Sequence, residues 1–328
     1  MKSWLNPLLT VLLIGMAGVS LSVGSVSVDV VGGLSDWLSQ IPSSSAVVVG
    51  EIRLPRTLLA VLVGGALGLS GAALQGLLRN PLADPSLTGA SQGAALGAAA
   101  VFYFGVFASW GFLAPAIAGL LGAGVAMMLM LFLAGSSRAS LVLLAGLAIS
   151  TVTGALLATV LNFAPNPFAM QELVFWLLGS VSERGMQHVL LLFPAVLVGA
   201  WLIWRQRSFL SAISLGEDVA HSLGYSFTRR SRQVVLGAAI LVGTSVSVAG
   251  AIGFVGLLVP HLLRPWVQHR PDRLLIPSAL AGAALVTAAD TLVRLLPPGR
   301  EIKLGVITAL LGSPLFIWLI WKDRQKWL

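Results

Sequence analysis

The chain contains no cysteine among its 328 residues, and only 10% of its residues are charged. The absence of cysteine excludes disulfides, thiolate metal sites and cysteine nucleophiles. The shortage of charge, beside 57% apolar residues, argues against a soluble domain, because a soluble domain of this length needs a far more polar surface. A chain of this composition is expected to lie in a lipid bilayer.

Histidine and lysine are also scarce, with four residues of each. The histidines lack the ligand spacing of a zinc site, so we predict no bound metal and no cofactor. None of the lysines lies in a GxxxxGK[ST] phosphate-binding loop, so any ATP hydrolysis must belong to another polypeptide. The net charge of +8 comes from arginines that separate apolar runs, which argues against nucleic acid as a partner.

Ten charge-poor apolar runs are candidates to cross a bilayer, which takes about 20 residues per helix. They are residues 7–24, 56–78, 88–107, 111–135, 141–162, 188–205, 233–250, 253–266, 277–296 and 304–321. The eighth run is short and is predicted to be a half-helix within the bundle. The first run resembles a signal peptide, but it lacks an Ala-x-Ala cleavage site and favours a retained helix. We therefore predict an all-α polytopic membrane protein with one transmembrane domain over residues 1–328.

The distribution of basic residues orients these ten spans. With both termini in the cytoplasm, fourteen of the twenty lysines and arginines are cytoplasmic, as the positive-inside rule requires. The other six are Arg53, Arg56, Arg184, Arg294, Arg300 and Lys303. Residues 206–232 then form the longest cytoplasmic loop.

That loop is predicted to carry a short helix. Ser214 and Glu217 have the spacing of a capping box, Asp218 adds favourable charge at the helix N-terminus, and Gly224 can end the helix in the left-handed conformation. Four apolar residues are predicted to share one face: Leu215, Val219, Ala220 and Leu223. Such a helix can contact an ATPase subunit or rest on lipid headgroups.

Other charged residues also have two interpretations. Asp290 lies inside a predicted span, where it can pair with Arg294 four residues later or act as a proton carrier. Arg53 and Arg56 stand on the periplasmic side, where they can bind carboxylates of a partner or extend to the membrane interface. The turn at residues 79–85 contains two prolines, which fix its backbone. A plain tight loop explains these prolines as well as a functional turn does.

Several long motifs occur in a fixed order along most of the chain. They are RLPRTLLAVLVGGALGLSGAALQGLLRNPLADPSLTG (53–89), FWLLGS (175–180), SLGEDVAHSLG (214–224), AGAIGFVGLLVPHLLR (249–264), AAD (288–290) and LGSPLFIWL (311–319). In these motifs the sequence resembles the FecCD/BtuC-type permeases of bacterial ABC importers for iron-siderophores, haem and vitamin B12.

The resemblance implies a type II ABC importer permease fold, a homodimer of ten-helix subunits, two cytoplasmic ATPases and a periplasmic substrate-binding protein. It assigns contacts with the ATPase to a coupling helix that includes Leu215, Gly216, Glu217, Asp218, Ala220, Leu223 and Gly224. It assigns a cytoplasmic gate to Asn80, Leu82, Ala139 and Ser140. It assigns docking of the binding protein to Arg53, Arg56 and Arg294.

Two positions depart from the family pattern. Ala139 stands where relatives carry a hydroxyl, and Lys303 follows Glu301-Ile302 where a proline is usual. The expected function is the uptake of an iron chelate, siderophore or haem, across the bacterial inner membrane by alternating access. The alternatives are a vitamin B12 or corrinoid importer, a proton-coupled secondary transporter that uses Asp290, and a structural bundle or channel.

Overall fold

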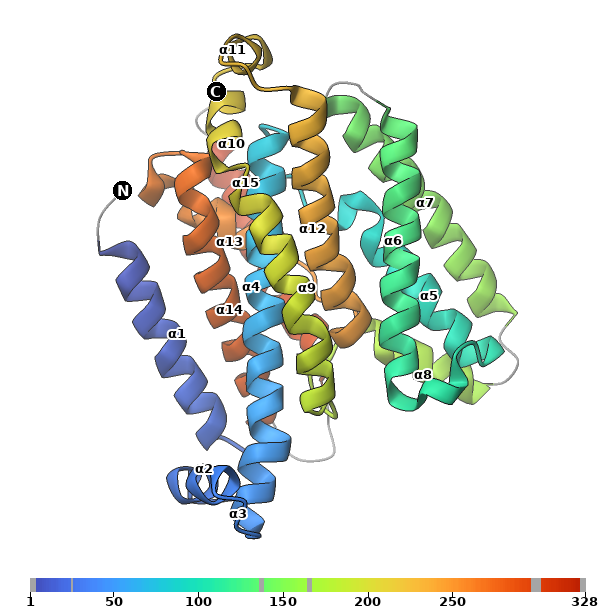
Figure 1. The fold of residues 1–328 in the computed structure, drawn as a ribbon, viewed down its shortest axis with the longest axis vertical. Helices are drawn as coiled ribbons and strands as arrows, with labels where there is room; N and C mark the ends of the chain where they lie inside the picture. Colours follow the sequence, from blue (N-terminus) through green and yellow to red (C-terminus); the bar gives the residue numbers. More distant parts are fainter. Residues whose placement is uncertain (1–3, 25, 136–138, 164–166, 296–301, 325–328) are drawn as a thin grey trace.

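The computed structural model describes residues 4–24, 26–135, 139–163, 167–295 and 302–324. Within these ranges the regular elements are all helices, and Figure 1 shows the long ones side by side in one bundle. A backbone in lipid must satisfy its N–H and C=O groups internally, which apolar runs achieve by forming helices. The all-α prediction is confirmed.

Seven helices in the described ranges are long and apolar enough to cross a membrane. They are α1 (Leu5–Ser22), a continuous helix ending with α4 (Leu54–Leu77), α6 (Ala114–Ala134), α7 (Ala139–Asn162), α9 (Met186–Trp204), α12 (Phe227–Ala249) and α14 (Pro271–Arg294). Shorter apolar stretches lie in α5 (Ala90–Phe104), in α13 (Val255–Leu263) with η4 (Arg264–Val267), and in α15 (Leu304–Arg324). These elements coincide with the ten predicted runs, while ten full crossings stay a prediction.

Short helices connect the long ones. They are α2 (Val30–Leu38), α3 (Ser44–Ala46), the π-helix η1 (Val47–Arg53), η2 (Pro85–Thr88), η3 (Ala108–Leu113), α8 (Pro167–Leu177), α10 (Arg207–Ser214) and α11 (Glu217–Ser222). The helical path breaks inside η3 at Gly111, whose φ is 58°. A positive φ suits glycine, and this break lies in the connection between α5 and α6.

The centre of the bundle is α4, which packs against α14, α12, α13 and α9. Glycine lets its backbone touch two neighbours directly. A Cβ on Gly68 would collide with the carbonyl of Ser278, and one on Gly71 would collide with that of Gly256. Close backbone approach provides the packing energy that the hydrophobic effect does not supply between helices in lipid.

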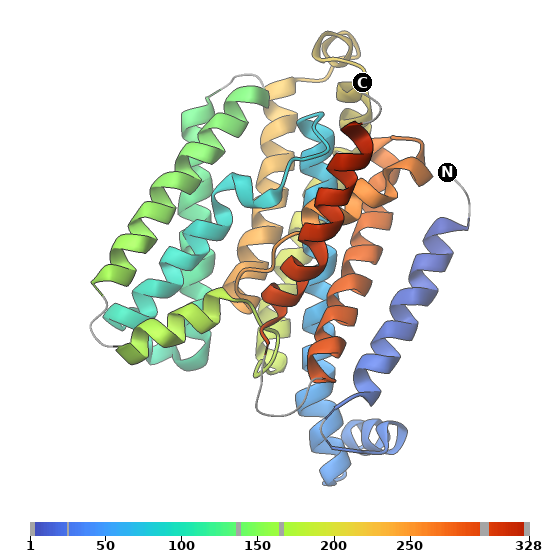
Figure 2. The same ribbon diagram turned by 180° about the vertical axis from the view of Figure 1, so that it is seen from behind.

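The bundle has two distinct ends. In Figures 1 and 2, α1 begins, α15 ends and α10 and α11 lie at one end, called here the α11 end. The opposite end carries α2, α3 and α8 and is called the α2 end. Segments at the α11 end bear Arg79, Arg205, Arg207, Arg229, Arg230, Arg232, Arg264, Arg270 and Arg273. This concentration of positive charge matches the side that the sequence predicts to be cytoplasmic.

Several predicted boundaries differ from the structure; α14, for example, begins at Pro271 and not at residue 277. The hydropathy pattern starts a span at residue 233, whereas α12 begins at Phe227. Its first two turns include Arg229, Arg230 and Arg232. Charged residues mark the level of the membrane surface, not the end of a helix, so the helix continues beyond the apolar run.

Candidate functional site

The short helix α11 is held between α10 and α12 by the backbone at its two ends. At its start, Gly216 adopts φ 127°, which allows the sharp turn that follows α10. At its end, Gly224 has φ 82° and donates to the carbonyl of His221, while Tyr225 donates to that of Ala220. These two bonds form a Schellman motif, and the predicted left-handed glycine at the helix end is confirmed.

The predicted capping box is wrong. Ser214 is the last residue of α10, and its hydroxyl donates to the carbonyl of Ser211 at 2.7 Å. The N-cap of α11 is Gly216, without a side-chain cap. The spacing of Ser214 and Glu217 is correct for a box, but the turn at Gly216 separates these residues into two helices.

The outward side of α11 is both apolar and acidic. Leu215, Val219 and Leu223 are 71%, 40% and 61% exposed. Asp218 is exposed as well. Ala220, predicted to share one face with these three apolar residues, is buried. Exposed apolar residues beside carboxylates at the tip of a membrane bundle are typical of a protein contact surface.

The turn after α4 lies beside α11. The Arg79 guanidinium is 3.8 Å from the Glu217 carboxylate. The Asn80 side chain accepts a hydrogen bond from the backbone of Leu82 at 2.9 Å, an Asx turn, and Leu82 is 45% exposed. The structure therefore brings the first half of the predicted gate next to the predicted coupling helix.

The other half of the gate lies at the start of α7. Helix η2, which follows the turn, packs against α7, and the Ser150 hydroxyl donates to the carbonyl of Ser86. Helix α7 begins at Ala139, followed by Ser140. The side chains of Ala139 and Ser140 lie outside the described part of the chain, so their role in the gate stays a prediction.

At the α2 end, one buried carboxylate joins two arginines. Asp290 is 1% exposed; it accepts from Arg56 at 2.9–3.0 Å and from Arg294 at 2.7 Å. The predicted i,i+4 pair with Arg294 is confirmed. The Arg56 contact joins α4 to α14 across 234 residues of sequence, a separation that no local pattern reveals.

Two arginines also hold the end of α1. Arg53 donates to the carbonyls of Leu21 and Ser22, and Arg294 donates to those of Ser20 and Val23. The last carbonyls of a helix have no partner within it and carry its negative dipole. The guanidiniums therefore satisfy and neutralise the C-terminus of α1. Because it is bound to the end of α1, Arg53 is only 4% exposed.

These features can be compared with known proteins. The model of the FecCD transport family matches residues 10–322. The chain belongs to the FecCD transport family. It is 38% identical to the vitamin B12 import system permease protein BtuC of Salmonella paratyphi A, over 88% of this chain and 87% of that protein. It is 36% identical to the cobalamin import system permease protein BtuC of Halobacterium salinarum, over 94% and 85%.

Solved structures show the same fold. One metal-chelate type ABC transporter in an inward-facing conformation has a TM-score of 0.83 and 31% identity, with 97% of this chain and 98% of that chain covered. PsaBC from Streptococcus pneumoniae has a TM-score of 0.54 at 17% identity, over 88% and 93%. This FecCD protein is thus a multi-pass permease subunit of an ABC importer, whose ATPase is a separate subunit.

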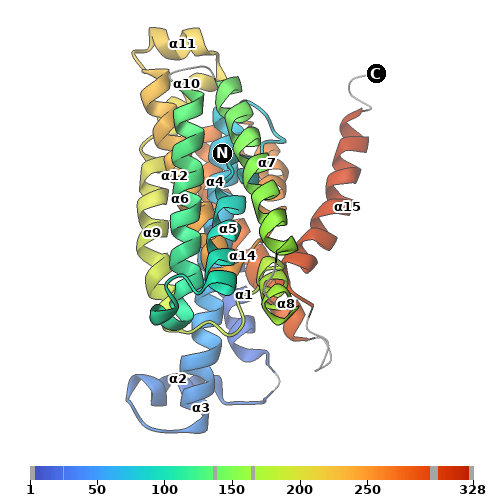
Figure 3. The same ribbon diagram turned by 90° about the vertical axis from the view of Figure 1, so that its right-hand side faces the viewer.

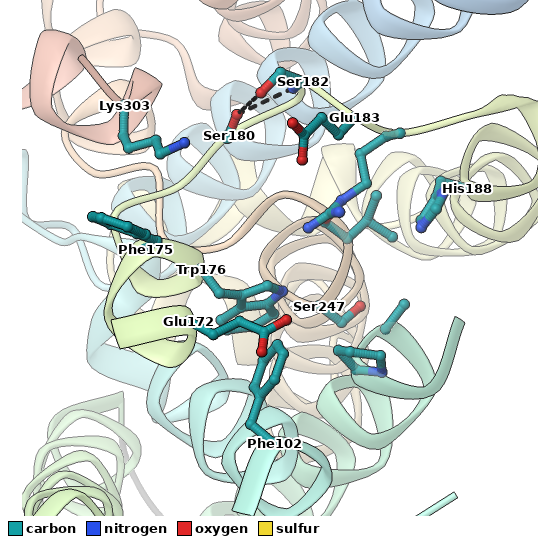
Figure 4. A pocket seen from close by; sticks show the side chains of 14 residues that line it. Phe102, Glu172, Phe175, Trp176, Ser180, Ser182, Glu183, His188, Ser247 and Lys303 are labelled. Atoms are coloured by element: carbon teal, nitrogen blue, oxygen red, sulfur yellow. Dashed lines mark hydrogen bonds between the residues drawn. The ribbon is translucent and has the colours of Figure 1, made fainter. Parts of the chain in front are cut away.

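The FecCD permease has a polar cavity at its α2 end that sequence reasoning missed. The cavity has a volume of about 360 Å³ and is lined by residues that include Glu172, Trp176, Arg184, Ser247 and Lys303. Figure 4 shows Glu172 beside Trp176 on α8, with Lys303 across the loop that carries Ser180. The charged residues near the FWLLGS motif could have indicated this cavity, because charged residues are rare in this chain.

Arg184 is a fixed part of that cavity wall. Its Nε donates to the carbonyl of Val248 at 3.0 Å, near the C-terminus of α12. Burial lowers the pKa of the Arg184 guanidinium from its ordinary value, and the charge of Glu183 opposes this change. An arginine keeps its charge under such a shift, so it gives the cavity a positive group near a helix end that favours one.

Proposed function

We propose that this FecCD permease imports a bulky metal chelate from the periplasm to the cytoplasm of a bacterium, driven by a separate ATPase. The observation that carries the proposal is α11, an exposed apolar and acidic helix at the more basic end of the bundle. That end is taken as cytoplasmic, with both termini on the same side. In this arrangement α11 is the coupling helix that contacts the ATPase.

The support for this role is mechanical. Helix α11 is covalently continuous, through α10, with α9 and directly precedes α12, and the Arg79–Glu217 contact connects it to the turn after α4. A displacement of α11 by the ATPase therefore acts on three long helices together. Alternating access needs this kind of collective shift between an outward and an inward opening.

The test replaces the two carboxylates of α11 by amides in Glu217→Gln/Asp218→Asn. We expect about fivefold less ATPase to co-purify, from about 1 kcal/mol of lost charge interaction at an exposed site. The control is Asp29→Asn/Asp36→Asn, which makes the same charge change at the α2 end. Equal ATPase recovery from the two double variants would contradict the coupling role.

We further propose that the turn with Asn80 and Leu82 forms the cytoplasmic gate with Ala139 and Ser140. The supporting geometry is the packing of η2 against α7, which places the turn and the start of α7 at the same end. Since Arg79 contacts Glu217, movement of the coupling helix reaches the gate without an intermediate element.

At the opposite end, we propose that Arg53, Arg56 and Arg294 attract the carboxylates of a periplasmic binding protein. Arg56 and Arg294 share the single carboxylate of Asp290, and Arg53 binds only backbone carbonyls, which leaves a local excess of positive charge. Arg56 is the most accessible, with its side chain 18% exposed against 8% for Arg294. Docking is therefore expected to weaken as salt concentration rises.

For the cargo, we propose a corrinoid first, because the relatives named above are vitamin B12 and cobalamin permeases. An iron chelate, siderophore or haem, is the second candidate, and the similarity to a metal-chelate type transporter fits either cargo. Uptake of cyanocobalamin, a ferric siderophore and haemin into proteoliposomes with the ATPase and binding protein separates the candidates. Accumulation of an iron chelate but not cyanocobalamin would reverse this order.

Two observations favour ATP-driven import over a proton-coupled carrier. Asp290 is buried, and both of its carboxylate oxygens are bonded to Arg56 or Arg294, so the group belongs to an internal network and does not face an open pathway. The family also works with an ATPase. Uptake is expected to survive collapse of the proton gradient and to stop when ATP is withheld. The opposite result would identify a secondary transporter.

A further inference from the structure

An apolar groove on the outside of the bundle has no role in the proposed transport cycle. It lies between α9 and α14 with α4 at its base, and its volume is about 440 Å³. All its lining residues are leucine, isoleucine, alanine or tryptophan, among them Leu69, Leu197, Trp201, Trp204, Ile276 and Leu280. In Figure 1, α4 is visible between α14 and α9. We call this feature the α9–α14 groove.

The groove opens to the surroundings of the bundle. Leu197, Trp201 and Ile276 from its two walls are 53%, 54% and 41% exposed. A recess lined by apolar groups does not hold water well, because water needs two or more polar partners. Since these helices are membrane-spanning, the available filling material is hydrocarbon.

The mouth of the groove at the α11 end is strongly basic. The guanidinium of Arg205 lies 4.8 Å from the ring centroid of Trp201, and that of Arg207 lies 4.5 Å from Trp204. Arg273 precedes Ile276 by one turn of α14 and therefore lies on the same side of that helix. Two of the three mouth arginines are thus held by cation–π contacts with residues that line the groove.

These positive charges have no acidic partner in the part of the chain that the structure describes. In the ranges that the structure describes, none of Arg205, Arg207 and Arg273 forms an ion pair, and the adjacent Asp272 is bound to Arg270 at 2.9 Å. Arginine matches phosphate oxygens well. A cationic cluster at the end of an apolar groove complements an anionic headgroup joined to an acyl chain.

We propose that the α9–α14 groove binds one anionic phospholipid of the leaflet at the α11 end. An acyl chain lies against α4 between α9 and α14, and the phosphate contacts Arg205 and Arg207, with Arg273 adding charge. The site differs from general lipid contact because the groove and the mouth arginines provide two recognition elements together. Bound lipid connects α9, α4 and α14, and the inference does not depend on the identity of the cargo.

The first test measures lipid binding to the purified full chain by native mass spectrometry. Phosphatidylglycerol is titrated against Arg205→Gln/Arg207→Gln, with phosphatidylcholine as the zwitterionic comparison. Because each arginine near a lipid surface contributes about a fivefold gain in affinity for an anionic lipid, we expect about 25-fold weaker phosphatidylglycerol binding and little change for phosphatidylcholine. The control is Arg229→Gln/Arg232→Gln; Arg232 bonds the carbonyl of Gly135, away from the groove.

The second test fills the groove without changing charge. Ala279→Phe places a ring in the groove, and Val125→Phe on the exposed side of α6 is the control, since Val125 is 60% exposed. We expect Ala279→Phe alone to reduce phosphatidylglycerol binding. Wild-type affinity in either groove variant would overturn the proposal, as would an equal loss of both lipids in the arginine variant. These readouts involve no transport, so they are independent of the proposed function.

Discussion

Asp290 illustrates how a single residue can determine the stability of one end of this protein. Its carboxylate is almost fully buried and lies between Arg56 and Arg294. Arg294 also donates a hydrogen bond to the end of α1. Burial of charge is costly unless it is paired and hydrogen-bonded, and each group here satisfies that condition through the others. The network joins α1, α4 and α14.

Asp290→Asn removes the negative charge and keeps the shape of the side chain. We expect the free energy of unfolding to fall by about 3 kcal/mol, because two guanidiniums then lack a counter-charge in a buried place. The measurement is the thermal unfolding midpoint of the purified protein. Asp272→Asn is the control, since its partner Arg270 is 48% exposed and the pair is worth about 1 kcal/mol or less. Similar losses in both variants would refute this role for Asp290.

At the scale of elements, the long helices could be predicted, and among their connections only the short helix α11 with its left-handed Gly224 could be. An apolar run long enough to cross a membrane can be recognised directly in the sequence. A π-helix such as η1 or a short helix such as α8 leaves no comparable pattern of residues. The failed capping box has a similar cause, because the backbone turn at Gly216 depends on its φ and not on residue spacing. The partners of Arg53 and Arg56 required tertiary structure, since their nearest carboxylate and carbonyls are far away in sequence.

The glycines of α4 provide a test of packing within one element. Gly71→Ala is expected to lower the unfolding midpoint, because its methyl group would collide with the backbone of Gly256 and displace α13. Such overpacking lowers the free energy of unfolding by about 1–3 kcal/mol. Gly65→Ala is the matched variant, since its Cβ would meet the Ala279 carbonyl at an ordinary 3.6 Å. Alanine favours helix there by up to about 1 kcal/mol. An equal fall in both midpoints would count against close backbone packing at Gly71.

At the scale of the whole molecule, α15 is the long helix that packs least extensively against its own chain. Figure 3 shows it standing apart from the main group of helices; it packs against α13 and α14, and its Gly305 donates to the carbonyl of Leu178. Leu310, Leu311 and Ile317 are 61%, 49% and 67% exposed. We propose that α15 contributes to the contact with a second copy of the permease, in agreement with the predicted homodimer.

The cysteine-free chain makes this contact measurable. A single Leu310→Cys is expected to form an intermolecular disulfide under mild oxidation in membranes, because no other thiol competes for it. The readout is the fraction of covalent dimer on a denaturing gel. Val125→Cys on α6, similarly exposed, is expected to remain monomeric. Dimer formation at Val125 and not at Leu310 would place the subunit contact elsewhere.

The helix that contains α4 runs without interruption from Ser44 to Leu77, 34 residues in all. At 1.5 Å per residue it is about 51 Å long, well beyond the roughly 30 Å of a hydrocarbon core. Its close crossings with α14, at Gly64 and Gly68, lie near the middle of α4. If this long helix tilts as a rigid body about these crossings, its two ends move in opposite directions. We therefore expect opening on one face of the membrane to be geometrically tied to closing on the other.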